Sequence, residues 1–214
     1  EVLENINLFV DEGEFVSIVG YTGSGKSTLL SIACGLQAPD RGQVKIGGMV
    51  VSELSPHSSM VFQNYSLLPW FSALENVRLG VEGKVPTWSR ICQSEQATRY
   101  LEMVGLSNAL DKRPGQLSGG MRQRVTIALA ASLNPRIMIG DEPTTALDVV
   151  VQRGVIQMLK DIQKKLKNTI ILVTHDMGVH ANIADRIGIM YAGKIVEEAT
   201  TEQRADRERA RQRV

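Results

Sequence analysis

The amino-acid sequence predicts an α/β fold: a mostly parallel β-sheet flanked by helices, with an N-terminal antiparallel β-subdomain and an α-helical insertion. Three observations lead to this prediction. An apolar, β-branched run from Phe15 to Val19 indicates a buried strand, which passes through glycines into a helical pattern. The apolar runs 137–140 and 169–173 indicate further buried strands. Between them, Asp148 opens a long helical pattern with one apolar stripe. The length of 214 residues suits one such domain.

The turn after the first strand has the pattern Gly20-x4-Gly25-Lys26-Ser27-Thr28, which is typical of the phosphate-binding loop of a nucleoside triphosphatase. Glycines let successive backbone N–H groups point at a polyphosphate, and the helix beginning near Lys26 adds its positive end. Lys26 is expected to reach the β- and γ-phosphates, and Ser27 to hold Mg²⁺. The expected nucleotide-binding residues of this loop are Gly20, Tyr21, Thr22, Gly23, Ser24, Gly25, Lys26, Ser27 and Thr28.

Partial alternation of apolar and polar residues predicts a strand over Glu1–Val10 as well. The turn at 11–13 would join it as a hairpin to the strand that precedes the loop. Because the chain would then begin in mid-sheet, we expect its native N-terminus to lie upstream. Short strands are also expected at 43–46 and 60–62.

An apolar loop, NYSLLPW over 64–70, follows Gln63 and has two interpretations. It is either a buried connection or a docking patch formed by exposed Leu67, Leu68, Trp70 and Phe71.

From 73 to 113 the pattern is mostly helical, with a break at 80–86 and a helix over 95–104. We interpret this section as a helical insertion beside the nucleotide core. The expected organisation is one domain over 1–214, in which 1–72 and 134–200 form the core and 73–116 a helical subdomain. Residues 201–214 form a charged tail, expected as a solvated or frayed helix.

Three polar clusters follow. Ser118 is a natural N-cap for a helix running to Leu133, and Gly119 and Gly120 would let backbone N–H groups approach a ligand. The strand 137–140 delivers Asp141 and Glu142, which suit a Mg²⁺-associated carboxylate and one that polarises a water. The strand 169–173 presents His175, a candidate γ-phosphate ligand. A last hairpin is expected at 187–190 and 194–197.

Composition narrows the function classes. A net charge of +1 and an aromatic content of 5% argue against a general nucleic-acid binder. The two cysteines, Cys34 and Cys92, lack a metal-binding spacing, and Cys34 is expected to fill space on the first helix in a reducing compartment. No apolar run approaches a bilayer span and no signal peptide is apparent, so a membrane role would come from a partner.

The motifs, taken in order, resemble the nucleotide-binding subunit of ATP-binding-cassette (ABC) transporters over nearly the whole chain. They are the phosphate loop, Gln63 after a strand, Leu117-Ser118-Gly119-Gly120, Asp141-Glu142-Pro143, Ala146-Leu147-Asp148 and Thr174-His175-Asp176.

This resemblance implies ATP and Mg²⁺ as cofactors and a role for each matched residue. Glu142 matches the catalytic glutamate, His175 the switch histidine, and Gln63 the glutamine that contacts Mg²⁺ or water and senses the membrane partner. Asp141, with Ser27, matches the metal-associated pair. Ser118, Gly119 and Gly120 match the signature that binds the γ-phosphate of the other subunit's ATP, and Asp148 belongs to a loop crossing the dimer interface.

The implied protein is the ATP-hydrolysing subunit of an ABC importer. It would work as an ATP-sandwich dimer, either a homodimer or a pair with another ABC ATPase, beneath integral-membrane permease subunits. It would lie peripherally on the cytoplasmic face of the inner or plasma membrane, without nucleic acid.

Below family level the motifs point in two directions. VFQNYSLLPW (61–70) resembles nitrate, sulfonate and taurine importers, whereas DEPTTALDV, THDMGV and ADRIGIMYAGKIVE resemble dipeptide and oligopeptide importers. Two alternatives therefore stay open: a recombinant or designed chimaera without a native transport partner, and a soluble ABC-type ATPase of DNA maintenance. The family's adenine-stacking aromatic would lie before Glu1, so weaker ATP binding is expected.

Overall fold

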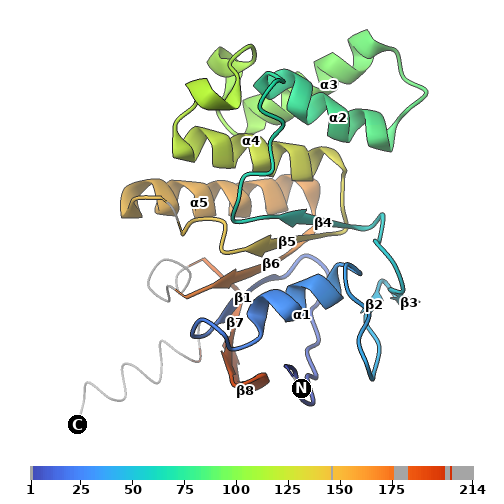
Figure 1. The fold of residues 1–214 in the computed structure, drawn as a ribbon, viewed down its shortest axis with the longest axis vertical. Coiled ribbons are helices and arrows are strands. Elements are labelled where there is room, and N and C mark those ends of the chain that lie inside the picture. Colours follow the sequence, from blue (N-terminus) through green and yellow to red (C-terminus); the bar gives the residue numbers. More distant parts are fainter. Residues whose placement is uncertain (1, 146, 176–182, 201–202, 204–214) are drawn as a thin grey trace.

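The computed structural model describes residues 2–145, 147–175, 183–200 and 203 (Figure 1). Glu1, Ala146, Asp176 and nearly all of the expected charged tail lie outside the described residues. The centre of the fold is a six-stranded sheet with the strand order β4-β5-β6-β1-β7-β8. Its strands are β1 (Phe15–Val19), β4 (Ser58–Val61), β5 (Ile137–Asp141), β6 (Thr169–Thr174), β7 (Arg186–Tyr191) and β8 (Lys194–Thr200). All neighbours pair in parallel except β7 and β8, so the predicted mostly parallel sheet is confirmed.

Helices cover both faces of this sheet, as parallel strands require (Figure 1). Helix α1 (Lys26–Ala33) lies on one face, and α5 (Val149–Leu166) lies on the other with α4 (Gly119–Ser132) beyond it. Strand β1 shows the layering: all five of its residues are buried. Phe15 and Val19 belong to the apolar cluster on the α4–α5 side, whereas Val16 and Ile18 belong to the cluster on the α1 side.

The expected strand over Glu1–Val10 is wrong: residues 2–10 form no strand. Strand β1 already pairs with β6 on one side and with β7 on the other, so neither of its edges can accept a hairpin partner. The alternation that suggested a strand is nevertheless real, because Leu3, Ile6, Leu8 and Val10 pack against the α1-side cluster. The described antiparallel pair near the N-terminus is instead β2 (Lys45–Ile46) with β3 (Met49–Val50).

The helical section contains α2 (Ala73–Lys84) and α3 (Arg90–Met103), followed by the short 3-10 turns η1 (Ser107–Ala109) and η2 (Pro114–Gln116). The expected break in the helical section is present, but it lies at 85–89 and not at 80–86, because α2 runs through Gly80 to Lys84. Glycine is needed there for close packing: a Cβ on Gly80 would lie 2.3 Å from Ser132 Oγ on α4. Helix α3 also begins five residues before the expected 95, because the Ser89 hydroxyl caps it by accepting from Cys92 N.

Within the described part of the chain, no helix has the length and apolarity needed to cross a bilayer.

Candidate nucleotide-binding and catalytic site

The candidate site forms at one edge of the sheet. Strands β1, β5 and β6 are parallel neighbours, so their carboxyl ends meet there. The phosphate loop follows β1, Asp141 and Glu142 stand at the end of β5, and His175 follows β6. The fold therefore brings together residues that are separated by more than a hundred positions in the sequence.

The loop over 20–25 adopts a shape that needs its glycines. Gly23 and Gly25 have φ angles of 81° and 98°, a region that side chains disfavour. Gly25 is also the N-cap of α1 and offers no side chain to the N–H groups of the first turn. Those groups stay available to an anion, as at other phosphate-binding helix ends.

Lys26 is buried, and its ammonium is held by the loop itself. The Nζ atom donates to the carbonyls of Gly20 (2.8 Å) and Tyr21 (2.9 Å). This arrangement keeps a cation beside the N–H groups at the start of α1. A polyphosphate bound there could replace the two carbonyls as the partner of Lys26.

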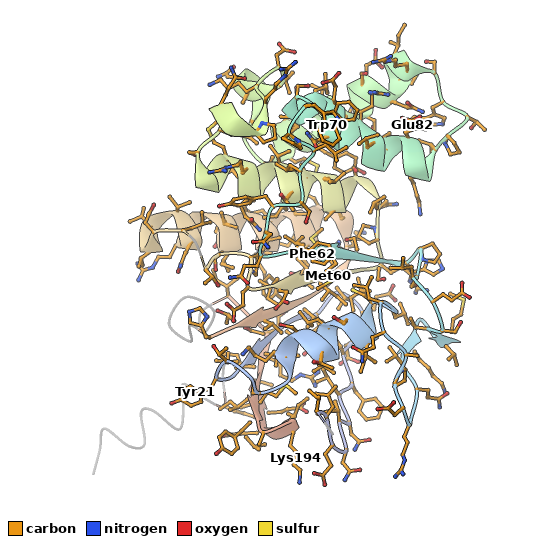
Figure 2. All side chains as sticks on the ribbon, viewed as in Figure 1. Tyr21, Met60, Phe62, Trp70, Glu82 and Lys194 are labelled. Carbon is orange, nitrogen blue, oxygen red and sulfur yellow. The ribbon has the colours of Figure 1, made fainter. Side chains whose placement is uncertain are left out.

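The phosphate loop packs against the β7–β8 hairpin. A Cβ on Gly20 would lie 2.3 Å from the Met190 carbonyl, and Gly193 N donates to the carbonyl of Ser24. Tyr21 points the other way, with 80% of its surface exposed (Figure 2).

Ser27 and Asp141 form a candidate Mg²⁺ site. The Ser27 hydroxyl donates to Asp141 Oδ1 over 3.1 Å, so a hydroxyl and a carboxylate oxygen lie together beside the phosphate loop. Oxygen ligands of this kind, completed by water and phosphate oxygens, are what Mg²⁺ prefers. Gln63 is exposed two residues after β4, which pairs in parallel with β5, so it lies at the same edge of the sheet.

Glu142 and His175 form a polar pair at this edge. His175 Nδ1 lies 3.1 Å from Glu142 Oε2, and the Thr145 hydroxyl donates to the same oxygen over 2.9 Å. Among the described residues, Glu142 Oε1 has no hydrogen-bond partner, so it can accept one from a water. The backbone of Glu142 is left-handed (φ 46°), which is uncommon outside glycine and is typical of functional sites.

The signature residues Ser118, Gly119 and Gly120 lie at the N-terminal end of α4 and not in the phosphate loop. Ser118 caps α4 by accepting from Met121 N, and α4 lies on the opposite side of the sheet from α1 (Figure 1). Its glycines permit tight packing against the start of α5: a Cβ on Gly120 would lie 2.7 Å from Val151 Cγ1. Asp148 caps α5 by accepting from Val151 N. Within the described residues, no hydrogen bond joins the signature to the phosphate loop.

The loop over 64–70 combines both of its expected interpretations. Leu67, Leu68 and Phe71 are half-buried, so the alternative in which they are all exposed together with Trp70 is wrong, and Leu67 packs against the core. Trp70 is 62% exposed on the helical side of the molecule, far from Tyr21 (Figure 2).

Asn76, which no sequence motif singled out, fixes the loop from α2. It is buried, its Oδ1 accepts from Leu68 N, and its Nδ2 donates to the carbonyls of Leu68, Phe71 and Ser72. A buried asparagine with a full set of partners has no signature in the sequence beyond its polar character on an apolar helix face.

A P-loop ATPase core with a composite set of motifs is therefore the class that this fold and site define. The family model described as "ABC transporter" matches residues 3–145, and the chain belongs to this family of ATP-binding, ATP-hydrolysing transport proteins. Among similar curated proteins, the bicarbonate transport ATP-binding protein CmpD of Synechocystis sp. is 43% identical over 90% of this chain and 68% of its own length. The nitrate import ATP-binding protein NrtD of Synechococcus elongatus is 42% identical over 89% of this chain and 70% of its own.

A solved structure of a dimeric, post-hydrolysis ATP-binding cassette bound to ADP and Pi is also similar. It is 36% identical, with a TM-score of 0.84, and the match covers 94% of this chain and 90% of that one.

Proposed function

We propose that this chain is the ATPase subunit of an ABC importer for a small inorganic anion, and that it works as a head-to-tail dimer enclosing two ATP molecules. The observation behind the dimer is the split between the two halves of the site. The phosphate loop, Asp141, Glu142 and His175 share one edge of the sheet, whereas Ser118 and the signature glycines lie across the sheet from α1. The similar cassette bound to ADP and Pi is itself dimeric, which supports the same arrangement.

In this mechanism each residue has a defined task. The loop N–H groups and Lys26 bind the phosphates, and Ser27 with Asp141, assisted by Gln63, would hold Mg²⁺, which neutralises phosphate charge. Glu142 accepts a hydrogen bond from the attacking water through Oε1. His175 and Thr145 hold the other oxygen, so the carboxylate is oriented before the water arrives. Ser118, Gly119 and Gly120 complete the site of the second subunit, and Asp148 lies at the interface.

The cargo comes from the relatives and not from the site, because an ATPase of this kind need not touch what is carried. Two proteins similar over about nine-tenths of this chain are named for bicarbonate and nitrate transport. Permease subunits would supply the path through the membrane and hold this chain at its cytoplasmic face. Uptake of labelled bicarbonate or nitrate by permeases lacking their own ATPase would test this cargo class.

The resemblance of the C-terminal half to peptide importers favours a second cargo class, dipeptides or oligopeptides, and with it the chimaera hypothesis. Restored peptide uptake would support the peptide class. ATP turnover without restored uptake of any of these cargoes would instead support a chimaera or a soluble ATPase.

A mixing experiment tests the composite site. The variant Lys26→Ala lacks the phosphate cation but keeps its signature, and Ser118→Arg has the reverse defect. Each variant alone should hydrolyse no ATP. Their mixture should regain activity, because a mixed dimer contains one intact loop facing one intact signature. A mixture as inactive as its components would contradict the head-to-tail dimer.

A further inference from the structure

Tyr65, in the loop after Gln63, contacts one face of the signature helix. A Cβ built on Gly119 would lie 3.1 Å from its hydroxyl, and the Arg122 guanidinium lies over its ring, 4.9 Å from the centroid. The Thr126 hydroxyl donates to its carbonyl over 2.7 Å. Positions 119, 122 and 126 follow the three- and four-residue spacing of a single helix face. Tyr65 therefore lies along the first two turns of α4.

The contact between the Tyr65 ring and Arg122 is partly shielded from solvent. Arg122 Nε is buried and has no hydrogen-bond partner among the described residues, so the aromatic ring is the group that faces this part of the cation. Cation–π attraction is stronger where water is excluded. The Thr126 hydroxyl is buried as well and also donates to the Arg122 carbonyl, which ties the tyrosine backbone to the same turn of the helix.

The loop that carries Tyr65 is fixed at its other end too. Ser66 has a left-handed backbone (φ 50°), a conformation that persists only where neighbouring contacts hold it. Two residues later, Leu68 exchanges two hydrogen bonds with Asn76 of α2. The loop is therefore joined to α4 through Tyr65 and to α2 through Leu68, so a displacement of its exposed end would act on these contacts.

We propose that Tyr65 is a positioning residue that couples the loop after Gln63 to the signature helix. Through Arg122 and Thr126 it sets where Ser118 and the signature glycines lie relative to Gln63, so a shift of the exposed loop is transmitted to the half-site offered to the second subunit. This inference rests on the proposed function, because it assigns Tyr65 an effect on ATP-dependent pairing and none on ATP binding by one chain.

The test compares Tyr65→Leu, Tyr65→Phe and a matched control, Trp88→Leu, which removes an exposed aromatic from outside the loop. Tyr65→Leu should weaken ATP-dependent dimerisation about threefold to thirtyfold, the range of a cation–π contact, and lower turnover in parallel. Binding of a fluorescent ATP analogue to the dilute monomer should stay unchanged. Tyr65→Phe keeps the ring beneath Arg122 and should lie close to the parent, as should Trp88→Leu.

A double-mutant cycle with Arg122→Gln separates coupling from general destabilisation. If the ring acts through Arg122, Tyr65→Leu should have little further effect on dimerisation in the Arg122→Gln background. Full additivity, or equal losses in Tyr65→Leu and Trp88→Leu, would overturn the proposal. A parental chain that neither dimerises nor hydrolyses ATP would instead contradict the proposed function, so the two failures are distinguishable.

Discussion

The two cysteines differ in reactivity at the residue scale. Burial raises the pKa of the Cys34 thiol to about 11, outweighing a hydrogen bond from Ser58, whereas Cys92 is exposed on α3. At pH 8 only roughly one Cys34 in a thousand would be a thiolate, and the thiolate is the reactive form. Native protein at pH 8 should therefore release one equivalent of chromophore from a disulfide reagent quickly, and a second only after unfolding. Rapid reaction of two thiols in the folded chain would contradict this burial.

The raised pKa of Cys34 also makes the stability of the folded state depend on pH. Because the folded state holds the Cys34 proton more tightly than the unfolded chain, this contribution to stability is present below the ordinary thiol pKa and is lost as pH rises toward 11.

Single residues of the candidate site were largely predictable from the sequence, because each follows a recognisable strand or turn. Asp141 and Glu142 end an apolar run, and Lys26 follows a glycine pattern. The partners of these residues were not predictable. The contact of Thr145 with Glu142 depends on the left-handed turn of the backbone, and Tyr65 meets Arg122 only after two distant segments have packed together.

At the scale of the secondary-structure elements, replacing glycine with alanine should have opposite effects on stability at two helical positions. Gly154 lies in α5, and a Cβ there would meet only Arg124 Nη2 at 4.0 Å. Gly154→Ala should therefore stabilise the protein by up to about 1 kcal/mol, because alanine is the better helix former. For a chain of this size that gain corresponds to roughly 2–4 °C in Tm.

Gly80→Ala is the matched comparison in α2. Its Cβ would lie 2.3 Å from Ser132 Oγ and 2.9 Å from Leu129 Cδ1, so α2 would be forced away from α4. We expect a loss of about 1–3 kcal/mol, the usual cost of overpacking. Thermal unfolding of both variants checks the pair, and a change of the same sign in both would show that helix propensity, and not packing, decides at these positions.

Gly80 also shows why the break between α2 and α3 was predicted too early in the sequence. Glycine indicates a break when only local propensity is considered, but Gly80 lies where α2 packs against α4 without room for a Cβ. The first ten residues failed for a similar reason. Their alternation predicted a strand beside β1. In the folded sheet β6 and β7 already occupy both edges of β1, and this pairing cannot be inferred from local sequence. The buried strands were predictable because a parallel sheet covered on both faces needs continuous apolar runs.

At the scale of the whole molecule, the proposed mechanism needs two chains, since α1, which begins at the phosphate loop, and the signature helix α4 lie on opposite faces of one sheet. A variant that binds ATP without hydrolysing it should trap that pair. Glu142→Gln keeps the size of the side chain but removes the carboxylate that assists the water, which is typically worth about 10²–10⁴ in rate. The ATP-bound dimer should then persist, because hydrolysis of the bound ATP becomes slow.

The most direct measurement is therefore size-exclusion chromatography of Glu142→Gln, with bound nucleotide quantified in each fraction. We expect a dimer containing two ATP molecules in Mg-ATP and a monomer in ADP. Turnover should fall by about 10²–10⁴. The parental chain in ADP provides the monomer reference. A Glu142→Gln chain that is saturated with ATP and still elutes as a monomer would contradict the ATP-sandwich dimer, and hydrolysis at the parental rate would remove Glu142 from the mechanism.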